Sequence, residues 1–200
     1  AYERNKEAVH NENKYVFQCK NTDKICVFTD LGMMHSIKVM DIPYGRFRDK
    51  GTPIDNLSKY DGSKEEIVFL TNFGRLTGQL LLFATKMAMV KQVPAEEFIT
   101  NNRTVAATKL QEGDSLLTVR IVDLALQSAS GMFLRFSMEE IPELKKNSRG
   151  VRGMKLGAED ELEELYFVTQ QPQIVYKEKE VHLNRLKLAK RDGKGSKVRL

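Results

Sequence analysis

The sequence repeats itself with a period near 50 residues, and this feature restricts the possible folds more than any other. Residues 29–37 align without a gap with residues 85–93 and 128–136, and a fourth, partial copy occupies residues 174–195. A leucine four positions before an aspartate recurs in the first three copies: Leu57 with Asp61, Leu110 with Asp114, and Leu156 with Asp160. A period of this length is typical of repeat arrays and propellers.

Within one unit, the apolar segments are short and rich in Val, Ile, Phe and Tyr, which favours strands over helices. The strands predicted for the first unit are residues 15–19, 25–29, 34–39 and 67–70. Four short strands per unit, repeated around an axis, predict an all-β, propeller-like fold with almost no helix. In this register Leu57, Leu110 and Leu156 are equivalent, and we expect all three to be buried in the core.

Residues 76–90 leave an alternative open, because their apolar residues also have the spacing of an amphipathic helix. The repeat alignment instead places a hairpin turn at residues 85–88. We favour the hairpin, since the alignment covers several anchors whereas the helical pattern is local. A continuous helix over this segment would contradict the predicted fold.

Composition does not break between units, which predicts one domain over residues 14–200 after a linker-like segment, residues 1–13. The four units are predicted at about residues 14–70, 71–120, 121–168 and 169–200. The last unit is too short for four strands, so we expect residues 15–19 to complete it. The chain begins with Ala1 rather than Met, which indicates a fragment of a longer protein.

The net charge of +5 is concentrated at one end of the chain. Residues 185–200 hold seven basic side chains and one acidic one, whereas the preceding 184 residues hold 25 basic and 26 acidic ones. Such a distribution indicates polyanion binding, although a solvated tail is the plain alternative.

No apolar run approaches the ~20 residues that span a bilayer. Cys19 and Cys26 lack further ligands at zinc-site spacing, so we expect buried free thiols in a reducing compartment.

The repeated patterns resemble the C-terminal repeats of the A subunits of bacterial type IIA topoisomerases, DNA gyrase and topoisomerase IV. The similarity is strongest at residues 131–136 with 148–156 and Asp160, and at residues 90–98 with 110–114. It implies a β-pinwheel, a propeller-like ring whose blades exchange strands and whose basic outer rim bends DNA. The implied partners are double-stranded DNA, the remainder of the parent chain and, through it, the ATPase B subunit, with no membrane.

The resemblance places the domain in the cytoplasm, at the nucleoid, within a parent that hydrolyses ATP and changes DNA topology. The A subunits cleave DNA with a tyrosine that follows an arginine, and none of the six tyrosines here follows one. We therefore expect no catalytic residue, metal site or cofactor in this domain. The acidic residues 159–161 and 163–164 could in principle hold a metal, but alternating strand faces or a solvated loop fit them better, because neither a carbonyl-rich loop nor EF-hand spacing accompanies them.

Gyrase A subunits carry a basic heptapeptide, Gln-Arg-Arg-Gly-Gly-Lys-Gly, and residues 189–195 match it incompletely. Arg191 and the final Gly-Lys-Gly agree, whereas Ala189 and Asp192 replace the leading Gln and the first Gly. The heptapeptide is expected in the first blade, where this chain has residues 47–51. The altered sequence in a different unit favours the topoisomerase IV type, or a gyrase-like relative, over a true gyrase.

Basic residues recur in the loops of the repeat, and a ring would place equivalent loops on one rim. The predicted DNA contacts are Arg46, Arg48, Lys50, Lys91, Arg103, Lys145, Lys146, Arg149, Arg152, Lys190, Arg191 and Lys194. For any one of them taken singly, solubility is the better explanation, whereas the recurrence in three loops of four favours a phosphate-binding track. The alternative function is a protein-interaction propeller that does not bind DNA.

Overall fold

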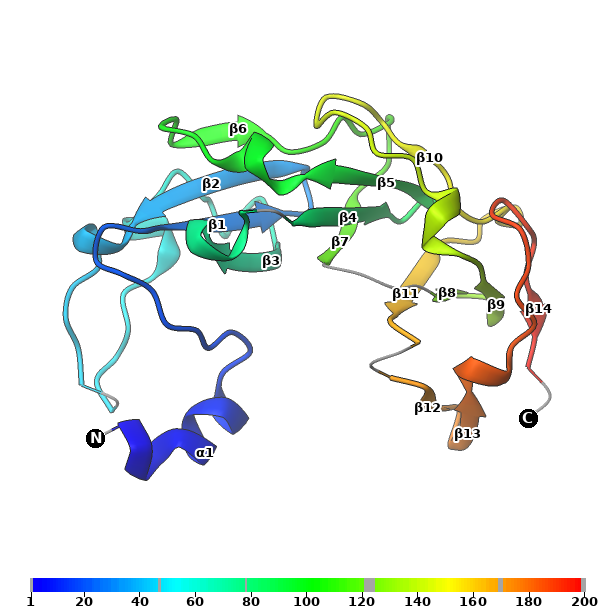
Figure 1. Cartoon of the computed structure of the whole chain (residues 1–200), viewed down its shortest axis with the longest axis horizontal. Coiled ribbons are helices and arrows are strands. Elements are labelled where there is room, and N and C mark those ends of the chain that lie inside the picture. The colour runs from blue at the N-terminus through cyan, green and yellow to red at the C-terminus, as the bar shows by residue number, and fades with distance from the viewer. Residues whose placement is uncertain (1, 47, 78, 121–124, 169–170, 199–200) are drawn as a thin grey trace.

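The computed structural model describes residues 2–46, 48–77, 79–120, 125–168 and 171–198. Three four-stranded antiparallel sheets and one two-stranded sheet follow one another along an arc (Figure 1). We call the sheets blades 1 to 4 in chain order. The predicted all-β, propeller-like fold is confirmed, although the described chain contains three complete blades rather than four.

Each complete blade combines three strands of its own unit with one strand from the next unit. Blade 1 has the order β3 (Ile67–Asn72), β1 (Lys24–Thr29), β2 (Met33–Lys38) and β6 (Thr104–Ala106). Blade 2 has the order β7 (Leu116–Arg120), β4 (Leu80–Thr85), β5 (Met89–Pro94) and β10 (Val151–Arg152). Blade 3 has the order β11 (Leu162–Tyr166), β8 (Ala125–Ser128), β9 (Met132–Arg135) and β14 (Ser196–Lys197). We call β6, β10 and β14 the exchanged strands.

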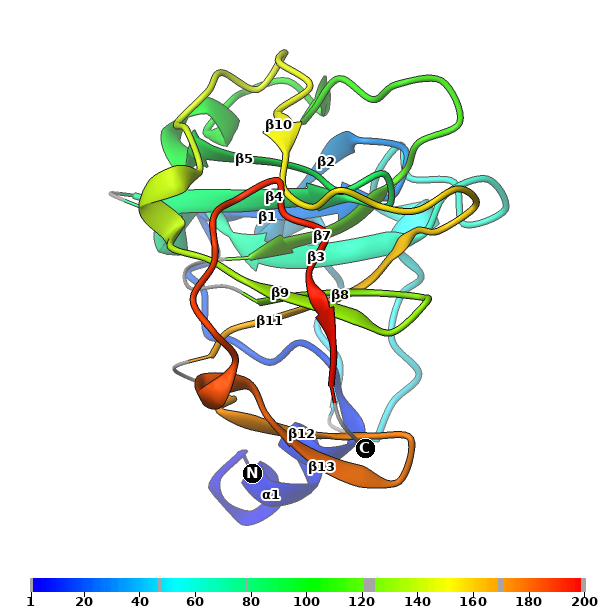
Figure 2. The same cartoon turned by 90° about the vertical axis from the view of Figure 1, so that its right-hand side faces the viewer.

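Blade 4 consists of β12 (Gln173–Tyr176) and β13 (Lys179–His182). Figure 2 shows β14 crossing from this hairpin back to the edge of blade 3. The helical segments are α1 (Tyr2–Glu12) and six 3-10 turns: η1 (Val39–Asp41), η2 (Ile54–Asn56), η3 (Phe73–Arg75), η4 (Ala95–Phe98), η5 (Met138–Glu140) and η6 (Leu183–Arg185). No described helix is long and apolar enough to cross a membrane.

The hairpin turns of blades 1, 2 and 3 each require a residue in the left-handed backbone conformation. Gly32, Ala88 and Gly131 occupy the aligned position, and all three have left-handed φ angles, of 72°, 58° and 80°. A glycine adopts this conformation at little cost, which explains two of the three residues. Residues 76–90 therefore form no continuous helix; β4 and β5 flank a tight turn, as the alignment predicts.

In blades 2 and 3, the aspartate of the recurrent leucine–aspartate pattern accepts a hydrogen bond from the backbone of this turn. Asp114 Oδ1 accepts a hydrogen bond of 3.0 Å from the Met87 N–H, and Asp160 Oδ1 accepts one of 2.9 Å from the Ser130 N–H. Partial burial opposes ionisation of Asp160, but the hydrogen bonds from Ser130 lower its pKa below the usual value. Within the acidic residues 159–164, Asp160 thus stabilises the turn between β8 and β9. Among the described residues, no group of three His, Cys, Asp or Glu could hold a metal.

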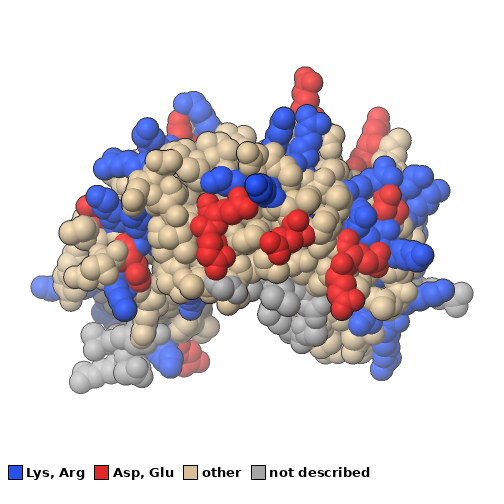
Figure 3. Space-filling model, turned by 45° about the horizontal axis from the view of Figure 1, so that its top comes forward, with Lys and Arg blue, Asp and Glu red and all other residues tan. Residues whose placement is uncertain are grey.

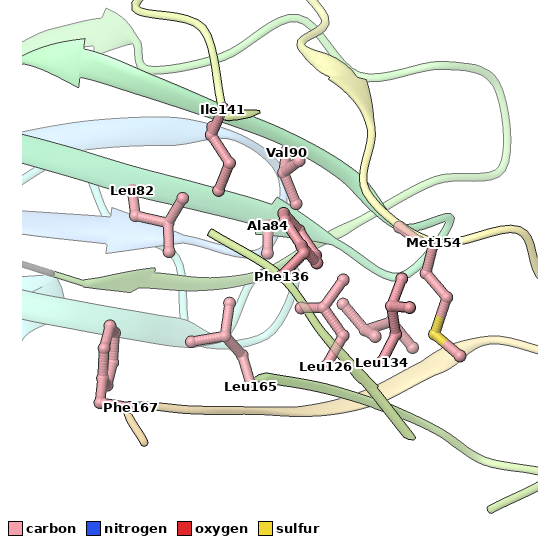
Figure 4. Close-up of a cluster of buried hydrophobic side chains, with 12 residues drawn as sticks. Leu82, Ala84, Val90, Leu126, Leu134, Phe136, Ile141, Met154, Leu165 and Phe167 are labelled. Carbon is pink, nitrogen blue, oxygen red and sulfur yellow. The ribbon is translucent and has the colours of Figure 1, made fainter. Parts of the chain in front are cut away.

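The core lies between neighbouring blades. Phe98 follows β5 and packs edge-on against Phe28 of blade 1, with ring centroids 5.1 Å apart. Ile141, the aligned residue of the next unit, lies in the cluster between blades 2 and 3 with Leu82, Val90 and others (Figure 4). Ile42 is the aligned residue of the first unit and is 39% exposed, because the described chain has no blade before blade 1. Burial at this position thus depends on a preceding blade.

Several expectations from the sequence need correction. Leu57, Leu110 and Leu156 are only half-buried, since all three lie in loops. Leu57 lies between η2 and β3, whereas Leu110 and Leu156 lie between an exchanged strand and the next strand of the same unit. Cys19 is exposed, whereas Cys26 is buried and its thiol pKa is raised by that burial.

Residues 15–19 form no strand and do not complete blade 4. They lie against blade 1, where the Tyr15 hydroxyl donates to the Val68 carbonyl at 3.4 Å and the Asn72 side chain donates to the Gln18 carbonyl at 2.9 Å. Before them, most of the predicted linker, residues 1–13, is helix α1. The boundary near residue 14 and the unit boundaries stay predictions.

Candidate nucleic-acid interface

The exchanged strands form the convex edge of the arc. In Figure 1, β6 and β10 lie along the top and β14 on the right, while β3, β7 and β11 lie on the concave side. A loop containing basic residues precedes each exchanged strand. Figure 3 shows Lys and Arg side chains in groups along this edge, with Asp and Glu among them. The structure therefore places these basic loops along one edge of the molecule (Figure 1).

The loop before β10 presents two exposed cations, Lys145 and Arg149. Lys146 lies between them and is half-buried; its N–H donates to Glu97 Oε2 at 3.0 Å and its Nζ donates to the Glu97 carbonyl at 3.1 Å. The loop ends at Gly150, whose φ is 89° and whose missing Cβ would lie 2.8 Å from the Val90 carbonyl oxygen. Glycine lets this backbone pack directly on β5 before β10 begins.

Lys91 cannot be a DNA contact, which corrects a prediction. Its side chain extends from β5 beneath the loop before β10 and is 1% exposed. The Nζ donates to the carbonyls of Lys145, Lys146 and Ser148 at 3.2, 2.7 and 2.8 Å. Burial lowers the pKa of this ammonium to about 8, although nearby Glu97 opposes the shift.

The loop before β14 contains the incomplete heptapeptide, and two of the predicted cations near it are engaged within the protein. Arg191 donates from Nε to the Glu140 carbonyl at 2.9 Å and from Nη1 to the Arg152 carbonyl at 2.6 Å. Arg152 in turn forms a two-pronged ion pair with Asp192, with Nη2 and Oδ2 2.8 Å apart. Its hydrogen bonds lower the pKa of Asp192. Lys190 and Lys194 are exposed.

Asp192 has a backbone conformation that favours glycine. Its φ is 66°, a left-handed conformation that glycine adopts readily and that Asp tolerates better than most residues. Gly195, which agrees with the heptapeptide, has a φ of 71°, and its missing Cβ would lie 2.6 Å from the Phe133 carbonyl oxygen. Both positions thus have backbone conformations suited to glycine, and Asp192 adds a negative charge at the first of them.

The remaining predicted contacts divide between two places. Arg103 is exposed just before β6, on the convex edge. Arg46, Arg48 and Lys50 are also exposed, but their loop extends away from blade 1 and lies beside α1, at the end of the arc (Figure 1). The structure thus brings Arg103, Lys145, Arg149, Lys190 and Lys194 onto one edge and leaves the first group apart.

Three further lysines of this edge were missed by the sequence reasoning. Lys109 and Lys155 are exposed shortly after β6 and β10. Each stands directly before the leucine of the leucine–aspartate pattern, so the repeat alignment contained the signal that could have found them. Lys197, within β14, is exposed as well.

The fold, with its exchanged strands and convex basic edge, defines the class of β-propeller known as a β-pinwheel. A family profile described as "DNA gyrase C-terminal domain, beta-propeller" matches residues 79–123 and 123–169. The DNA gyrase A protein of Chlamydia muridarum is 30% identical over 155 residues, which is 74% of this chain and 19% of that protein. The corresponding gyrase A protein of Lawsonia intracellularis is 32% identical over 141 residues, 68% of this chain and 17% of that protein.

Among solved structures, a crystal structure of the C-terminal domain of DNA topoisomerase IV superimposes with a TM-score of 0.81 at 21% identity. The match covers 94% of this chain and 65% of that one. The chain belongs to the family of C-terminal domains of DNA gyrase and topoisomerase IV A subunits. It spans about a fifth of the length of the curated relatives that it matches.

Proposed function

We propose that the chain binds duplex DNA along its convex edge and bends it. The observation that carries this proposal is the placement of Arg103, Lys145, Arg149, Lys190 and Lys194 in equivalent loops along one curved edge. Cations on a convex surface neutralise phosphates on the facing side of a duplex, and the added contacts offset the cost of bending it. Contacts of this kind read little sequence, so binding is expected to be largely independent of sequence.

The parent, on this proposal, is an ATP-hydrolysing type II topoisomerase located in the cytoplasm at the nucleoid. The chain supplies the DNA-bending part of its breakage subunit, works beside the ATPase B subunit, and contributes no catalytic group or cofactor itself. Family membership supports this assignment. A curved DNA segment presented to the breakage domain would bias which segment is passed through the cut one.

We further propose the topoisomerase IV type rather than the gyrase type. The support is the altered heptapeptide: Asp192 introduces a negative charge next to Arg152, and Arg191 donates to protein carbonyls. Of the segment's three cations, Arg191 is bound within the protein, while Lys190 and Lys194 stay exposed. This favours a domain that bends DNA with lysines along the whole convex edge over one that depends on the complete heptapeptide.

A binding titration with random-sequence duplex at several salt concentrations tests the proposed function. Each phosphate contact is expected to contribute about 0.9 to the slope of log affinity against log salt. The variant Lys145→Glu with Arg149→Glu should bind more weakly and with a flatter slope. A matched control reverses Lys64 and Lys177, two exposed lysines in turns away from the exchanged strands, and should bind like the unaltered chain. Absence of salt-dependent binding would support the protein-interaction propeller instead.

A further inference from the structure

We propose that Lys91 is a positioning residue for DNA binding. Its buried ammonium holds residues 145–148 from beneath, so that this loop presents Lys145 and Arg149 to the phosphates. This inference rests on the proposed function and extends it to a residue that does not contact DNA.

The ammonium of Lys91 uses its full donor capacity on one short segment. An ammonium has three N–H donors, and all three carbonyl partners lie within residues 145–148. The Phe83 ring, whose centroid is 5.4 Å from Nζ, adds a cation–π contact from β4. Because the loop comes from the third unit and Lys91 from the second, this contact joins the exchanged segment to the blade that receives it.

Glu97 also holds this loop, but as a hydrogen-bond acceptor, whereas Lys91 acts as a donor. Its carboxylate accepts from the Lys146 N–H and its carbonyl accepts from Lys146 Nζ, at 3.0 and 3.1 Å. The loop carbonyls are thus bound by the Lys91 ammonium, and the Lys146 N–H is bound by the Glu97 carboxylate. Lys91 and Glu97 both come from the second unit. The two contacts leave the loop little freedom, which reduces the ordering cost when a duplex binds.

The direction of the carbonyls is favourable for binding an anion. A carbonyl oxygen carries partial negative charge and would repel a phosphate if it faced the rim. In the structure, the carbonyls of Lys145, Lys146 and Ser148 face the buried Lys91. Lys91 therefore removes three acceptors from the surface that Lys145 and Arg149 share.

The same position is filled differently in the other two blades. In blade 1, His35 binds Thr104 Oγ1 of β6 at 3.0 Å and Glu65 Oε1 at 2.9 Å. In blade 3, Leu134 lies beneath the loop before β14, where a Cβ on Gly193 would lie 3.0 Å from its Cδ1. All three side chains support an exchanged segment from below, and Lys91 is the one among them that binds a loop through its carbonyls.

The variant Lys91→Met tests the proposal, because Met keeps the length and apolar stem but has no donors. Tryptic cleavage after Arg149 in the folded chain should become at least about tenfold faster, since hydrogen bonds from a charged donor are lost. Duplex affinity should fall by about tenfold, because the loop must then be ordered on binding. The salt slope should stay unchanged, because no phosphate contact is removed.

Lys145→Met serves as the matched control in the same loop, and it should flatten the slope by about 0.9 without faster cleavage after Arg149. A flattened slope in Lys91→Met would show that Lys91 contacts phosphate and would overturn the proposal; so would unchanged cleavage after Arg149. The cleavage measurement needs no DNA, so the anchoring role is tested even if the chain does not bind a duplex.

If Lys91→Met does not fold, amine labelling of the unaltered chain tests the same point. Lys91 should remain unmodified with or without duplex, whereas Lys145 should be modified in the free chain and protected by duplex. Modification of Lys91 in the free chain, with protection by duplex, would refute the positioning role.

Discussion

At the residue scale, Asp192 neutralises one cation of the convex edge. It pairs with Arg152, an exposed guanidinium that would otherwise be available to phosphate. Changing Asp192→Asn should release Arg152, raise duplex affinity and steepen the salt slope by about 0.9. Exposed ion pairs contribute little to stability, so the fold should tolerate the change. Glu178→Gln, an equal charge change in the β12–β13 turn, is the control; equal effects of both variants would show that Arg152 lies off the DNA path.

Glu65 couples the stability of blade 1 to pH. It is buried and binds the His35 ring and the Asp61 N–H. Burial opposes its ionisation, but the hydrogen bonds that it accepts lower its pKa below the usual 4.5. A depressed folded pKa means that the stabilisation is fully present above about pH 4.5 and is lost as pH falls through the folded value.

Urea denaturation between about pH 6 and pH 3 would measure this coupling, since the interval spans the usual carboxyl pKa. The free energy of unfolding of the unaltered chain should decrease over the interval. In Glu65→Gln that decrease should be smaller, because the titrating group is absent. Parallel pH curves for the two proteins would show that Glu65 keeps its ordinary pKa in the folded chain.

At the element scale, the exchanged strands depend on glycines that let the incoming chain approach its blade. Gly195→Ala should prevent β14 from pairing with β9, because the new Cβ would lie 2.6 Å from the Phe133 carbonyl and φ is +71°. We expect a loss of about 1–3 kcal/mol, the usual cost of such backbone strain. Gly157→Ala is the control, since its Cβ would meet a single atom at 3.9 Å. Equal denaturation midpoints for the two variants would contradict this account.

At the scale of the whole molecule, the arc itself should bend DNA. Lys190 and Lys194 lie at one end of the convex edge, so reversing both should release that end of the duplex while Arg103, Lys145 and Arg149 still bind. Ligation of fragments of about 150 bp, the persistence length of DNA, reports bending directly. We expect circularisation to fall more than affinity does. A proportional loss of both would show that the last loop contributes affinity alone, without shaping the bend.

The sequence by itself determined the repeat, the hairpins and the family. Hairpin turns and strand alternation are local properties, so residues 85–88 could be recognised as a turn although residues 76–90 also fitted a helix. The leucine–aspartate pattern could be recognised equally well. Its leucines, however, are half-buried rather than buried in the core, because the loops that contain them lie outside the blades.

Only the tertiary structure decided which strands pair and which cations face the solvent. Exchange joins residues far apart in the chain, as His35 opposite Thr104 shows, and no local pattern specifies the blade that receives a strand. Lys91 and Lys145 are both lysines within the repeat, yet one is buried and the other exposed. The loop at residues 145–148 covers Lys91 and belongs to the third unit, which also supplies β10 to blade 2, so burial follows from strand exchange rather than from residue type.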